Sequence, residues 1–468
     1  MRLTKIICTL GPTSHTPEQI LALAKQGMTI ARFNFSHGSH DEQRKTIDAV
    51  KEVNAKQGFS IGLMMDTKGA EIRTGDVKEP ISISKGQEVV FSSVPLPKET
   101  RTVIIVNHDK FALDVQKAES ILLDNGVMSF ELVSLEKDGS VIARSRDDGS
   151  IGSRRHVNLP GADISLPAVM EKDWDDLRFG IEEKLDYVAL SFIRTADEVL
   201  EVKEFLKKNG STMSVMAKIE TRQAVANIDA IIAASDSIMV ARGDLGAEMP
   251  FEKIPAIQDM IVHKCRTAGK PVLVATQMLE SMIENPMPTR AEVTDIAHAA
   301  TTRADMTMLS GETASGQHPL AAVHAMHTIL AETEAHQSAD LQSDATCAFG
   351  EQSALADAAV SMALSTAASA IMVLTKSGKT ARAVSQLRSN LPIIAFTEDE
   401  DVQRYLLLFH AIQPLVIPFE NDPEKTVESA MNAGKKSGFL KKDQKVVLIS
   451  DSQLPAERVR GVQLRVIR

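Results

Sequence analysis

Two apolar stretches set the pattern of the fold: "SVMAKIE" at Ser214–Glu220 and "SIMVARGDLG" at Ser237–Gly246. Neither alternates with polar residues, which is typical of parallel strands covered on both faces. The first ends in Lys218 and Glu220, and the second in Asp244. Buried ionic groups are unfavourable unless they pair or bind a metal. Carboxylates suit Mg2+ and a lysine suits a phosphate or an oxyanion, but a salt bridge capping two strands explains these charges equally well.

The same kind of run recurs along the chain. The other runs are "KIICTL" (from Lys5), "MTIARFNF" (from Met28), "SIGLMMDT" (from Ser60), "YVALSF" (from Tyr187), "PVLVATQM" (from Pro271) and "ADMTMLSGE" (from Ala304). Amphipathic segments such as "TPEQILALAKQG" and "EKIPAIQDMIVHKCRTAGK" separate most of them. Counting the runs gives eight β-then-α units, which predicts an α/β fold with a (β/α)8 TIM barrel. The active site of such a barrel lies at the C-terminal ends of the strands, where polar residues gather in this sequence.

One interval breaks this rhythm, because roughly 100 residues separate the third and fourth runs, more than a crossover helix needs. Turn signals such as Lys85-Gly86 and Asp138-Gly139 divide it into short runs such as "EVVFSSV" and "SVIARSR". The interval predicts an inserted, mostly antiparallel β-barrel lid domain at the catalytic end of the barrel. The polar stretch "HQSADLQSDATCAFGEQ" then predicts a boundary before a separate α/β domain. The predicted parts are barrel 1–69 and 168–336, inserted lid 70–167, and C-terminal domain 337–468.

Composition narrows the class of protein. The chain has 468 residues, of which 43% are hydrophobic and 24% charged, as in ordinary globular proteins. A net charge of -10 without a basic block argues against nucleic acid or an anionic membrane as a partner. The three cysteines, Cys8, Cys265 and Cys347, have no metal or disulfide spacing, so we expect buried thiols and a cytoplasmic location. No signal peptide is expected before Gly11-Pro12, and no apolar run is long enough to span a bilayer.

Further polar groups stand at the predicted strand ends. Arg32 offers a planar fork for phosphate or carboxylate, although a lone arginine is more often a surface ion pair. The backbone N–H groups of Gly243 and Asp244 at a helix start could bind a carboxylate or phosphate. Thr276 supplies a hydroxyl that could equally cap a helix. Oxygen ligands for a monovalent cation follow the second and third strands, where spacing alone favours ordinary turns: Asn34, Ser36, Asp66 and Thr67.

Together these groups describe a phosphorylated, anionic substrate held by Arg32, Lys218 and a metal on Glu220 and Asp244. Lys218 and Glu220 are two residues apart, which places them on one strand face. The sequence has neither a P-loop nor a serine–histidine elbow. Lys218 could instead form a Schiff base, as in barrel aldolases.

At this point the chain resembles the pyruvate kinase family. The resemblance rests on "TKIICTLGP", "ARFNFSHG", "MDTKGAEIRTG", "VNLPGA", "SFIR", "AKIETRQAV", "MVARGDLG", "ATQMLESM", "NPMPTRAEVTD" and "MLSGETASG", in the family's order and spacing. It covers the barrel, the insertion and the C-terminal domain. It implies phosphoryl transfer from phosphoenolpyruvate to ADP, giving pyruvate and ATP, with Mg2+ and K+ as cofactors and a homotetrameric assembly.

The resemblance also assigns roles. Lys218 matches the lysine that stabilises the transferring phosphoryl group and the enolate oxygen, and Arg32 matches the phosphate-binding arginine. Glu220 and Asp244 match the Mg2+ ligands. The remaining matches are the substrate carboxylate site (Gly243, Asp244, Thr276), the K+ site (Asn34, Ser36, Asp66, Thr67) and the nucleotide contacts (His37, Arg73, Arg155). Glu71 matches the glutamate of K+-dependent members, so the resemblance predicts K+ dependence.

Departures from the family's pattern affect three places. Gly69-Ala70-Glu71 lacks the usual hinge proline, which could loosen the hinge. Arg155-His156 replaces a common Lys-Gly pair, so nucleotide handling could shift. The residues 301–303, Thr-Thr-Arg, make the entry to the eighth strand unusual. None of these changes removes a predicted catalytic residue.

The C-terminal domain resembles the family's regulatory domain through "TKSGKTAR". The residues expected to cradle a phosphorylated effector are Thr375, Lys376, Ser377, Gly378, Lys379 and Thr380. The stretch "SDSQLPAERVRG" replaces the family's glycine-rich loop, which argues against fructose-1,6-bisphosphate as that effector. An ordinary strand–turn–helix is the alternative.

Two other functions stay open at this stage. A Mg2+-dependent carbon–carbon lyase or aldolase would use the same barrel, metal and lysine. A catalytically weak paralogue would bind metabolites as a regulator. The insertion and the Lys218–Asp244 motifs disfavour the first, and the intact predicted catalytic residues disfavour the second.

Overall fold

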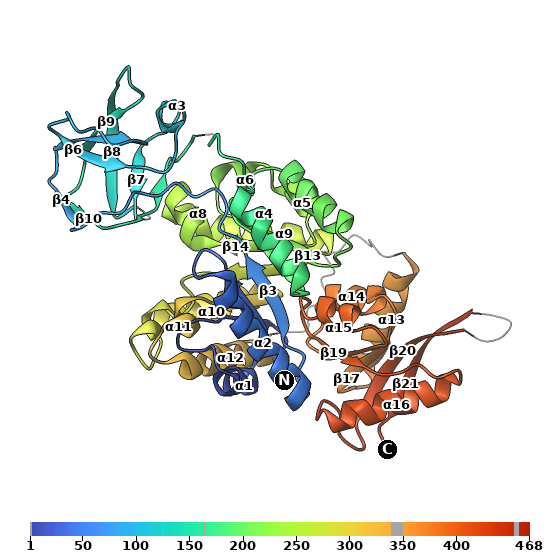
Figure 1. Cartoon of the computed structure of the whole chain (residues 1–468). Helices are drawn as coiled ribbons and strands as arrows, with labels where there is room; N and C mark the ends of the chain where they lie inside the picture. Colours follow the sequence, from blue (N-terminus) through green and yellow to red (C-terminus); the bar gives the residue numbers. More distant parts are fainter. Residues whose placement is uncertain (1, 125, 163, 338–349, 454–457) are drawn as a thin grey trace.

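Eight parallel strands close into a barrel in the computed structural model of the chain, which describes residues 2–124, 126–162, 164–337, 350–453 and 458–468 (Figure 1). The strand order around the barrel is β1-β16-β15-β14-β13-β12-β3-β2. Each strand lies within one of the eight predicted runs, so the predicted (β/α)8 fold is confirmed. The strands are β1 (Lys5–Thr9), β2 (Met28–Asn34), β3 (Gly62–Asp66), β12 (Tyr187–Leu190), β13 (Ser214–Ile219), β14 (Ser237–Ala241), β15 (Val272–Ala275) and β16 (Met306–Leu309).

Helices cover the outside of this barrel because their apolar faces pack against its strands in one continuous core. Local signals start them: Thr16 and Ser39 form capping boxes at the starts of α1 and α2. The helices are α1 (Pro17–Gln26), α2 (His40–Gln57), α4 (Glu171–Glu182), α5 (Ala196–Lys208), α6 (Arg222–Ala226), α7 (Ile228–Ala234), α8 (Arg242–Glu248), α9 (Ile254–Ala268), α10 (Arg290–Thr301), α11 (Gly311–Ala314) and α12 (Pro319–His336). Short 3-10 turns precede two of them: η1 (Phe251–Lys253) precedes α9, and η2 (Glu280–Ile283) precedes α10.

The insertion forms a separate β domain between β3 and β12 (Figure 1). Its strands make a six-stranded sheet, β11-β7-β8-β9-β5-β6, and a two-stranded sheet, β10-β4, around a core of their own. All pairs except β5–β6 are antiparallel, as predicted. The elements are β4 (Ile81–Ile83), β5 (Glu88–Ser92), β6 (Thr102–Ile105), α3 (Phe111–Val115), β7 (Ile121–Leu123), β8 (Met128–Leu135), β9 (Val141–Ser145), β10 (Gly149–Ile151) and β11 (Val157–Asn158).

The C-terminal domain is a five-stranded sheet in the order β19-β18-β17-β20-β21, with only β21 antiparallel. Its elements are α13 (Glu351–Ser365), β17 (Ala370–Leu374), α14 (Lys379–Gln386), β18 (Ile393–Thr397), α15 (Glu400–Leu406), β19 (Ile412–Val416), α16 (Pro423–Lys436), β20 (Lys445–Gln453) and β21 (Arg458–Val466). The predicted α/β domain is therefore confirmed, whereas the domain boundaries stay predictions. Most of the predicted linker, Cys347 and part of "SDSQLPAERVRG" lie outside the described residues.

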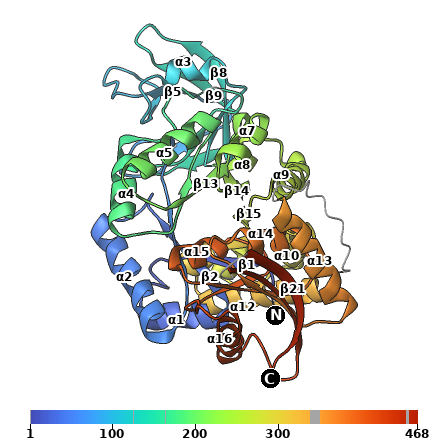
Figure 2. The same ribbon diagram turned by 90° about the vertical axis from the view of Figure 1, so that its right-hand side faces the viewer.

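The C-terminal domain packs against the N-terminal ends of the barrel strands (Figure 2). Arg388 makes a bidentate ion pair with Asp305, which precedes β16, with both N–O distances at 2.8 Å. The Ala411 N–H donates to the Leu3 carbonyl at 3.0 Å, and the Tyr187 hydroxyl donates to the Arg404 carbonyl. This packing closes one end of the barrel and leaves the C-terminal strand ends, next to the insertion, for the site.

The cysteines and the apolar helices were also subjects of sequence-based expectations. Cys8 and Cys265 are buried, as predicted, and burial raises the pKa of both thiols. No helix in the described ranges is both long and apolar enough to serve as a membrane span.

Candidate active site

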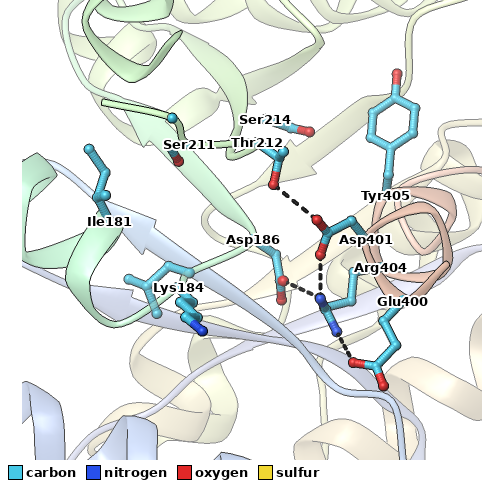
Figure 3. A pocket seen from close by; sticks show the side chains of 12 residues that line it. Ile181, Lys184, Asp186, Ser211, Thr212, Ser214, Glu400, Asp401, Arg404 and Tyr405 are labelled. Atoms are coloured by element: carbon cyan, nitrogen blue, oxygen red, sulfur yellow. Dashed lines mark hydrogen bonds and ion pairs between the residues drawn. The ribbon is translucent and has the colours of Figure 1, made fainter. Parts of the chain in front are cut away.

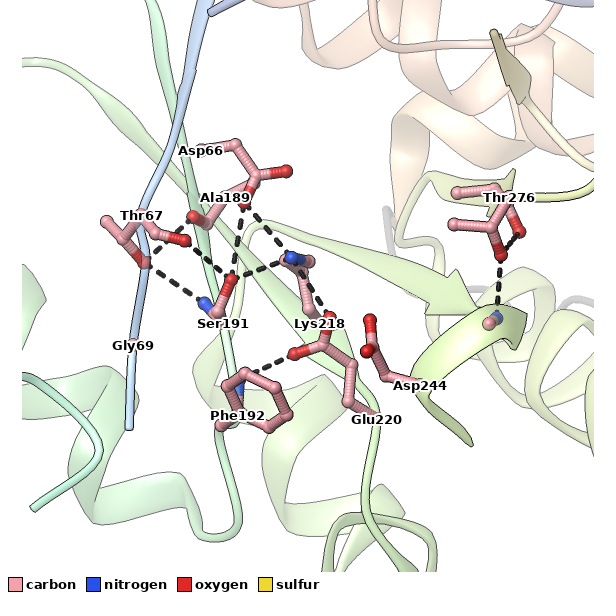
Figure 4. Close-up of polar contacts among 12 residues, drawn as sticks. Asp66, Thr67, Gly69, Ala189, Ser191, Phe192, Lys218, Glu220, Asp244 and Thr276 are labelled. Carbon is pink, nitrogen blue, oxygen red and sulfur yellow. Dashed lines mark hydrogen bonds and ion pairs between the residues drawn. The ribbon is translucent and has the colours of Figure 1, made fainter. Parts of the chain in front are cut away.

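Lys218 is the centre of a buried polar cluster at the C-terminal ends of β3, β12 and β13 (Figure 4). Its Nζ lies 3.0 Å from Asp66 Oδ1, 2.7 Å from Ser191 Oγ and 2.9 Å from Glu220 Oε1. Ser191 Oγ in turn donates to the Thr67 carbonyl at 2.7 Å. Neighbouring strands bring these groups together, since Asp66 pairs with Ala189 in the β3–β12 ladder. The salt-bridge alternative therefore describes real contacts, but as a network on three strands rather than a cap on two.

Burial and neighbouring charges act in opposite directions on this cluster. Burial alone would lower the pKa of Lys218, but the carboxylates of Asp66 and Glu220 outweigh it and raise that pKa. Burial alone would raise the pKa of Asp66, but the cations of Arg32 and Lys218 outweigh it and lower that pKa. Lys218 is thus held as a cation and Asp66 as a carboxylate at neutral pH.

Glu220 differs from Asp66, because burial raises its pKa in spite of the nearby lysine. One of its oxygens, Oε2, accepts a hydrogen bond from the Phe192 N–H at 2.6 Å. The other, Oε1, is buried and faces the Lys218 ammonium at 2.9 Å. A buried carboxylate whose pKa is raised even with this lysine beside it fits the role of a metal ligand, because a second cation would offset the burial of its charge.

Asp244 is the second predicted Mg2+ ligand, and it follows strand β14. It lies in the first turn of α8, and its side chain is 29% exposed, so it has an open face. Its negative charge contributes to raising the pKa of Glu220. In the described ranges no group of three or more histidines, cysteines or carboxylates is arranged to hold a metal. Two carboxylates fit Mg2+, which keeps several waters and shares its coordination with substrate phosphates.

Arg32, at the end of β2, is buried rather than on the surface. Its Nε donates to Asp66 Oδ2 at 2.7 Å, and its Nη1 donates to Thr9 Oγ at 2.9 Å. The surface ion-pair alternative is therefore wrong for Arg32. Since Asp66 bonds both Arg32 and Lys218, this carboxylate holds two cations side by side at the strand ends.

The four predicted K+ ligands come from adjacent strand ends, because Asn34 and Asp66 are partners in the β2–β3 ladder. Asn34 Oδ1 accepts from the Ser36 N–H at 3.1 Å, which is a turn contact. Thr67 Oγ accepts from the Ser191 N–H at 3.1 Å. The turn alternative therefore describes Asn34 and Ser36 in this structure, and K+ binding stays a prediction.

Thr276, after β15, has a role that neither sequence interpretation described. Its Oγ accepts from the Gly243 N–H at 2.8 Å and donates to the Ala275 carbonyl at 2.6 Å. Thr276 thus caps α8, which follows the neighbouring strand, and not a helix of its own. The Gly243 N–H is already engaged, so a carboxylate could use it only after this bond opens.

Backbone strain is found at two of these strand ends. Phe192 has φ +55° and Thr276 has φ +67°, in the left-handed region that side-chain-bearing residues rarely adopt. Such outliers are commonly found at functional sites, where surrounding contacts hold them. Here the Phe192 N–H is held by Glu220 and the Thr276 hydroxyl by Ala275.

The predicted nucleotide contacts are spread over the barrel and the insertion. Arg73 is paired with Glu71 at 2.6 Å, and Arg155 lies 3.3 Å from Asp124 within the inserted domain. His37 is exposed in the β2–α2 loop, where its carbonyl accepts from Gln43. No hydrogen bond or ion pair in the described part of the chain joins these three residues, so a shared nucleotide site stays a prediction.

His156 and Ser191 are site residues that sequence reasoning did not select. His156 extends from the inserted domain, and its Nδ1 lies 3.7 Å from Asp244 Oδ1. Its ring also packs edge-on against Phe192, with centroids 5.7 Å apart. Burial lowers the pKa of His156. The departure from the family at this position was the available signal for His156, whereas Ser191 lies in "SFIR", a motif that carried the family resemblance but was given no role.

The departure at residues 301–303 has a structural explanation. Thr301 is the last residue of α10 and Thr302 is its C-cap. Arg303 has φ +61°, and its Nη1 donates to the Arg388 carbonyl of the C-terminal domain. These residues therefore belong to the contact between domains rather than to the active site.

The predicted effector loop joins β17 to α14. Thr375 Oγ accepts from the Gly378 N–H at 3.0 Å, and Gly378 has φ +74°. Lys376, Ser377 and Lys379 are exposed, and Thr380 is half-buried. The loop therefore has a strand–turn–helix geometry with polar groups open to solvent. This geometry is compatible both with an effector site and with an ordinary connection.

A polar cavity of about 540 Å³ lies at the opposite end of the barrel, between the starts of β12 and β13 and helix α15 (Figure 3). Arg404 spans it, with Nε 2.7 Å from Asp186 and Nη1 3.2 Å from Glu400. None of the predicted site residues lines it. It belongs to the contact between the barrel and the C-terminal domain.

Comparison with known proteins gives consistent results over the whole chain. The family described as "Pyruvate kinase, barrel domain" matches residues 1–323, and "Pyruvate kinase, alpha/beta domain" matches residues 353–458. Plastidial pyruvate kinase 2 of Arabidopsis thaliana is 41% identical, over 99% of this chain and 81% of that protein. Pyruvate kinase of Dictyostelium discoideum is 41% identical, over 96% of this chain and 90% of that protein. The crystal structure of a pyruvate kinase from Cryptosporidium parvum superposes with a TM-score of 0.92 at 33% identity, covering 100% of this chain and 96% of that one.

Proposed function

The chain belongs to the pyruvate kinase family of phosphotransferases, and we propose that it transfers the phosphoryl group of phosphoenolpyruvate to ADP, giving pyruvate and ATP. The observation that carries this proposal is the buried Lys218 cluster, in which the lysine lies between the carboxylates of Asp66 and Glu220. Phosphoryl transfer needs positioning and charge neutralisation more than covalent chemistry. A cluster of fixed cations and carboxylates at the strand ends supplies both.

Lys218 and Arg32 bind the negative charge of the substrate in this proposal. Both cations are held in place by Asp66, so neither has to reorganise when the phosphoryl group moves. Lys218 is aimed at the phosphoryl group and at the enolate oxygen that forms when it leaves. Arg32 binds the phosphate through the part of its guanidinium that Asp66 and Thr9 leave open.

Glu220 and Asp244 are the residues that would hold Mg2+. A bound Mg2+ would neutralise phosphate oxygens and the developing charge. Glu220 is prepared for this by its burial and by the Phe192 N–H that fixes its Oε2. Asp244 is prepared by its place in the first turn of α8, where the helix orients its backbone.

Thr276 positions α8 in this proposal through its bond to the Gly243 N–H. The enolate needs a proton to become pyruvate, and Thr276 is the proposed route for it. Because the Thr276 hydroxyl proton is donated to the Ala275 carbonyl, this route requires that hydroxyl to rotate. The inserted domain acts as a lid that excludes water and brings Arg73 and Arg155 toward ADP.

The aldolase alternative is disfavoured by electrostatics. A Schiff-base lysine must lose its proton to attack a carbonyl, so its pKa is usually lowered. The carboxylates of Asp66 and Glu220 instead raise the pKa of Lys218. The cluster therefore favours a permanent cation over a nucleophile.

The test is a coupled assay with phosphoenolpyruvate, ADP, Mg2+ and K+. Pyruvate formation that requires both substrates supports the proposed function and excludes the regulator alternative. Release of pyruvate without ADP, or cleavage of an aldol substrate, would count against it. Adding sugar phosphates and AMP to the same assay tests the proposed effector loop, Thr375–Thr380, with Thr380→Ala as the variant that should lose the response.

Three further properties are proposed, two from family membership and one from the cysteines. K+ dependence is supported by Glu71 and by the oxygen-rich ends of β2 and β3, and is tested by leaving K+ out of the assay. A homotetramer is tested by light scattering of the purified chain. A cytoplasmic location, suggested by the scattered cysteines, is tested by fractionation of the source cells.

A further inference from the structure

Asp173, near the start of α4, bonds to both chain segments that connect the inserted domain to the barrel. Its Oδ1 accepts from the Lys68 and Gly69 N–H groups, each at 3.1 Å. Its Oδ2 accepts from the Met170 N–H at 2.8 Å. Asp173 is only 1% exposed, so these bonds lie out of water. One buried carboxylate thus joins the segment entering the insertion to the segment leaving it.

A helix cap alone does not explain this arrangement. A capping-box residue at the third position of a helix bonds the backbone at the start of its own helix, as Asp173 Oδ2 does with Met170. The two bonds of Oδ1 go instead to residues 104 and 105 positions earlier in the chain. They therefore serve the connection between domains.

Arg194 fastens the outgoing connection at a second point. Its Nη1 donates to the Ile164 carbonyl at 2.6 Å, and its Nη2 donates to the Leu166 carbonyl at 2.7 Å. Glu198 orients the guanidinium at 2.9 Å. Asp173 holds the outgoing segment at Met170, and Arg194 holds it at Ile164 and Leu166. The backbone of this segment is therefore restrained at both points.

The incoming connection is in contact with the catalytic cluster. Gly69 has φ +67°, and a Cβ built on it would lie 2.8 Å from both Cβ and the carbonyl oxygen of Ser191. Ser191 Oγ is the group that Lys218 contacts at 2.7 Å. A shift of the Lys68–Gly69 backbone would therefore displace Ser191, and with it a partner of Lys218.

We propose that Asp173 is a positioning residue that clamps the two connections of the inserted domain, so that the lid swings about a point fixed against Ser191. The proposal rests on the proposed function only in taking the insertion as the lid over the nucleotide site. Without the clamp the two connections move independently, and the lid residues reach ADP in many orientations rather than one.

The experiment compares Asp173→Asn with two control variants of the full chain. Asparagine has the same size, but one of its two bonding atoms is a donor, so it cannot accept from both connections at once. Asp175→Asn alters an exposed residue of the same helix that is paired with Arg178. Val202→Ala removes buried volume in α5 and reproduces a loss of stability without touching the connections.

Hydrogen–deuterium exchange of residues 66–72 and 167–173 is the direct readout. Asp173→Asn should speed exchange about tenfold in at least one of these segments, because a buried hydrogen bond is lost there. The KM for ADP should rise about fivefold while the KM for phosphoenolpyruvate changes less than about twofold, because only ADP depends on the lid. Both control variants should leave these segments and this ratio unchanged.

Exchange in both segments equal to the wild-type value would overturn the proposal. A parallel rise in both KM values, matching that of Val202→Ala, would overturn it as well, since it would indicate a general loss of stability. Failure of the proposed function is a separate result, because hydrogen–deuterium exchange does not require activity. Even if the wild-type chain were inactive, its exchange could still be compared with that of Asp173→Asn. If Asp173→Asn does not fold, Asp173→Glu keeps the carboxylate and the helix cap, and should still speed exchange at residues 66–72.

Discussion

Lys218→Met should separate the catalytic role of the cation from its structural role. The lysine is 8% exposed and lies between the carboxylates of Asp66 and Glu220. Removing one partner of a buried ion pair destabilises a protein by about 3–5 kcal/mol. Asp66 keeps its 2.7 Å contact with Arg32, and Glu220 can take up a proton because burial raises its pKa. We therefore expect a loss of about 3 kcal/mol, at the lower end of that range.

The expected loss of activity is larger than the loss of stability. Removing one neutral donor from an oxyanion site typically lowers kcat by about 10²–10³-fold, and a cation that neutralises a transferring phosphoryl group is worth about 10³–10⁵. Lys218→Met should therefore lower kcat by at least about 10³-fold at saturating substrates. The coupled assay measures kcat, and urea unfolding followed by circular dichroism measures stability.

Two companion variants make this reasoning refutable. Lys218→Met with Glu220→Gln removes the stranded carboxylate, so it should recover about 1–2 kcal/mol of stability without recovering activity. Lys264→Met removes a lysine whose exposed pair with Asp229 should contribute less than about 1 kcal/mol, and it should leave kcat unchanged. If Lys218→Met keeps kcat within about tenfold of the wild type, the assignment of Lys218 is wrong.

Three other predictions follow from single contacts. Wild-type activity should fall sharply in buffer free of K+ and Na+, and Glu71→Lys should restore part of it; full activity without K+ would contradict the role of Glu71. Burial lowers the pKa of Lys5 from 10.5 to about 7, so between these values the unfolded chain binds a proton that the folded chain does not, and stability rises with pH. Between about pH 7.5 and 9.5 urea unfolding should show a gain of about 2 kcal/mol that Lys5→Met abolishes, and a slope unchanged by Lys5→Met would count against it. Arg388→Met should destabilise the contact between the barrel and the C-terminal domain by about 3–5 kcal/mol, because Asp305 is 1% exposed and would lose its bidentate partner. A loss below about 1 kcal/mol in the same urea unfolding measurement would show that Asp305 finds other partners.

Local sequence predicted the parts of this protein that depend on local periodicity. Each of the eight barrel strands follows from a short apolar run, because a parallel strand covered on both faces needs apolar residues at every position. The insertion was recognisable because its runs alternate and are divided by turns. Lys218, Glu220 and Asp244 stood out because charge at the end of a buried run is unfavourable without a partner.

Only the tertiary structure decided which groups meet and what each one bonds. Asp66 lies 152 residues before Lys218, and Asp173 lies more than 100 residues after the Gly69 that it holds. Contacts of this kind depend on barrel closure and on the register of neighbouring strands, which no local pattern encodes. The bond from the Phe192 N–H to Glu220, the capping of α8 by Thr276 and the approach of His156 to Asp244 have the same origin. Sequence periodicity therefore determined the elements and their order, whereas closure of the barrel determined the chemistry, because a hydrogen bond requires two groups within about 3 Å and only the folded chain brings them that close.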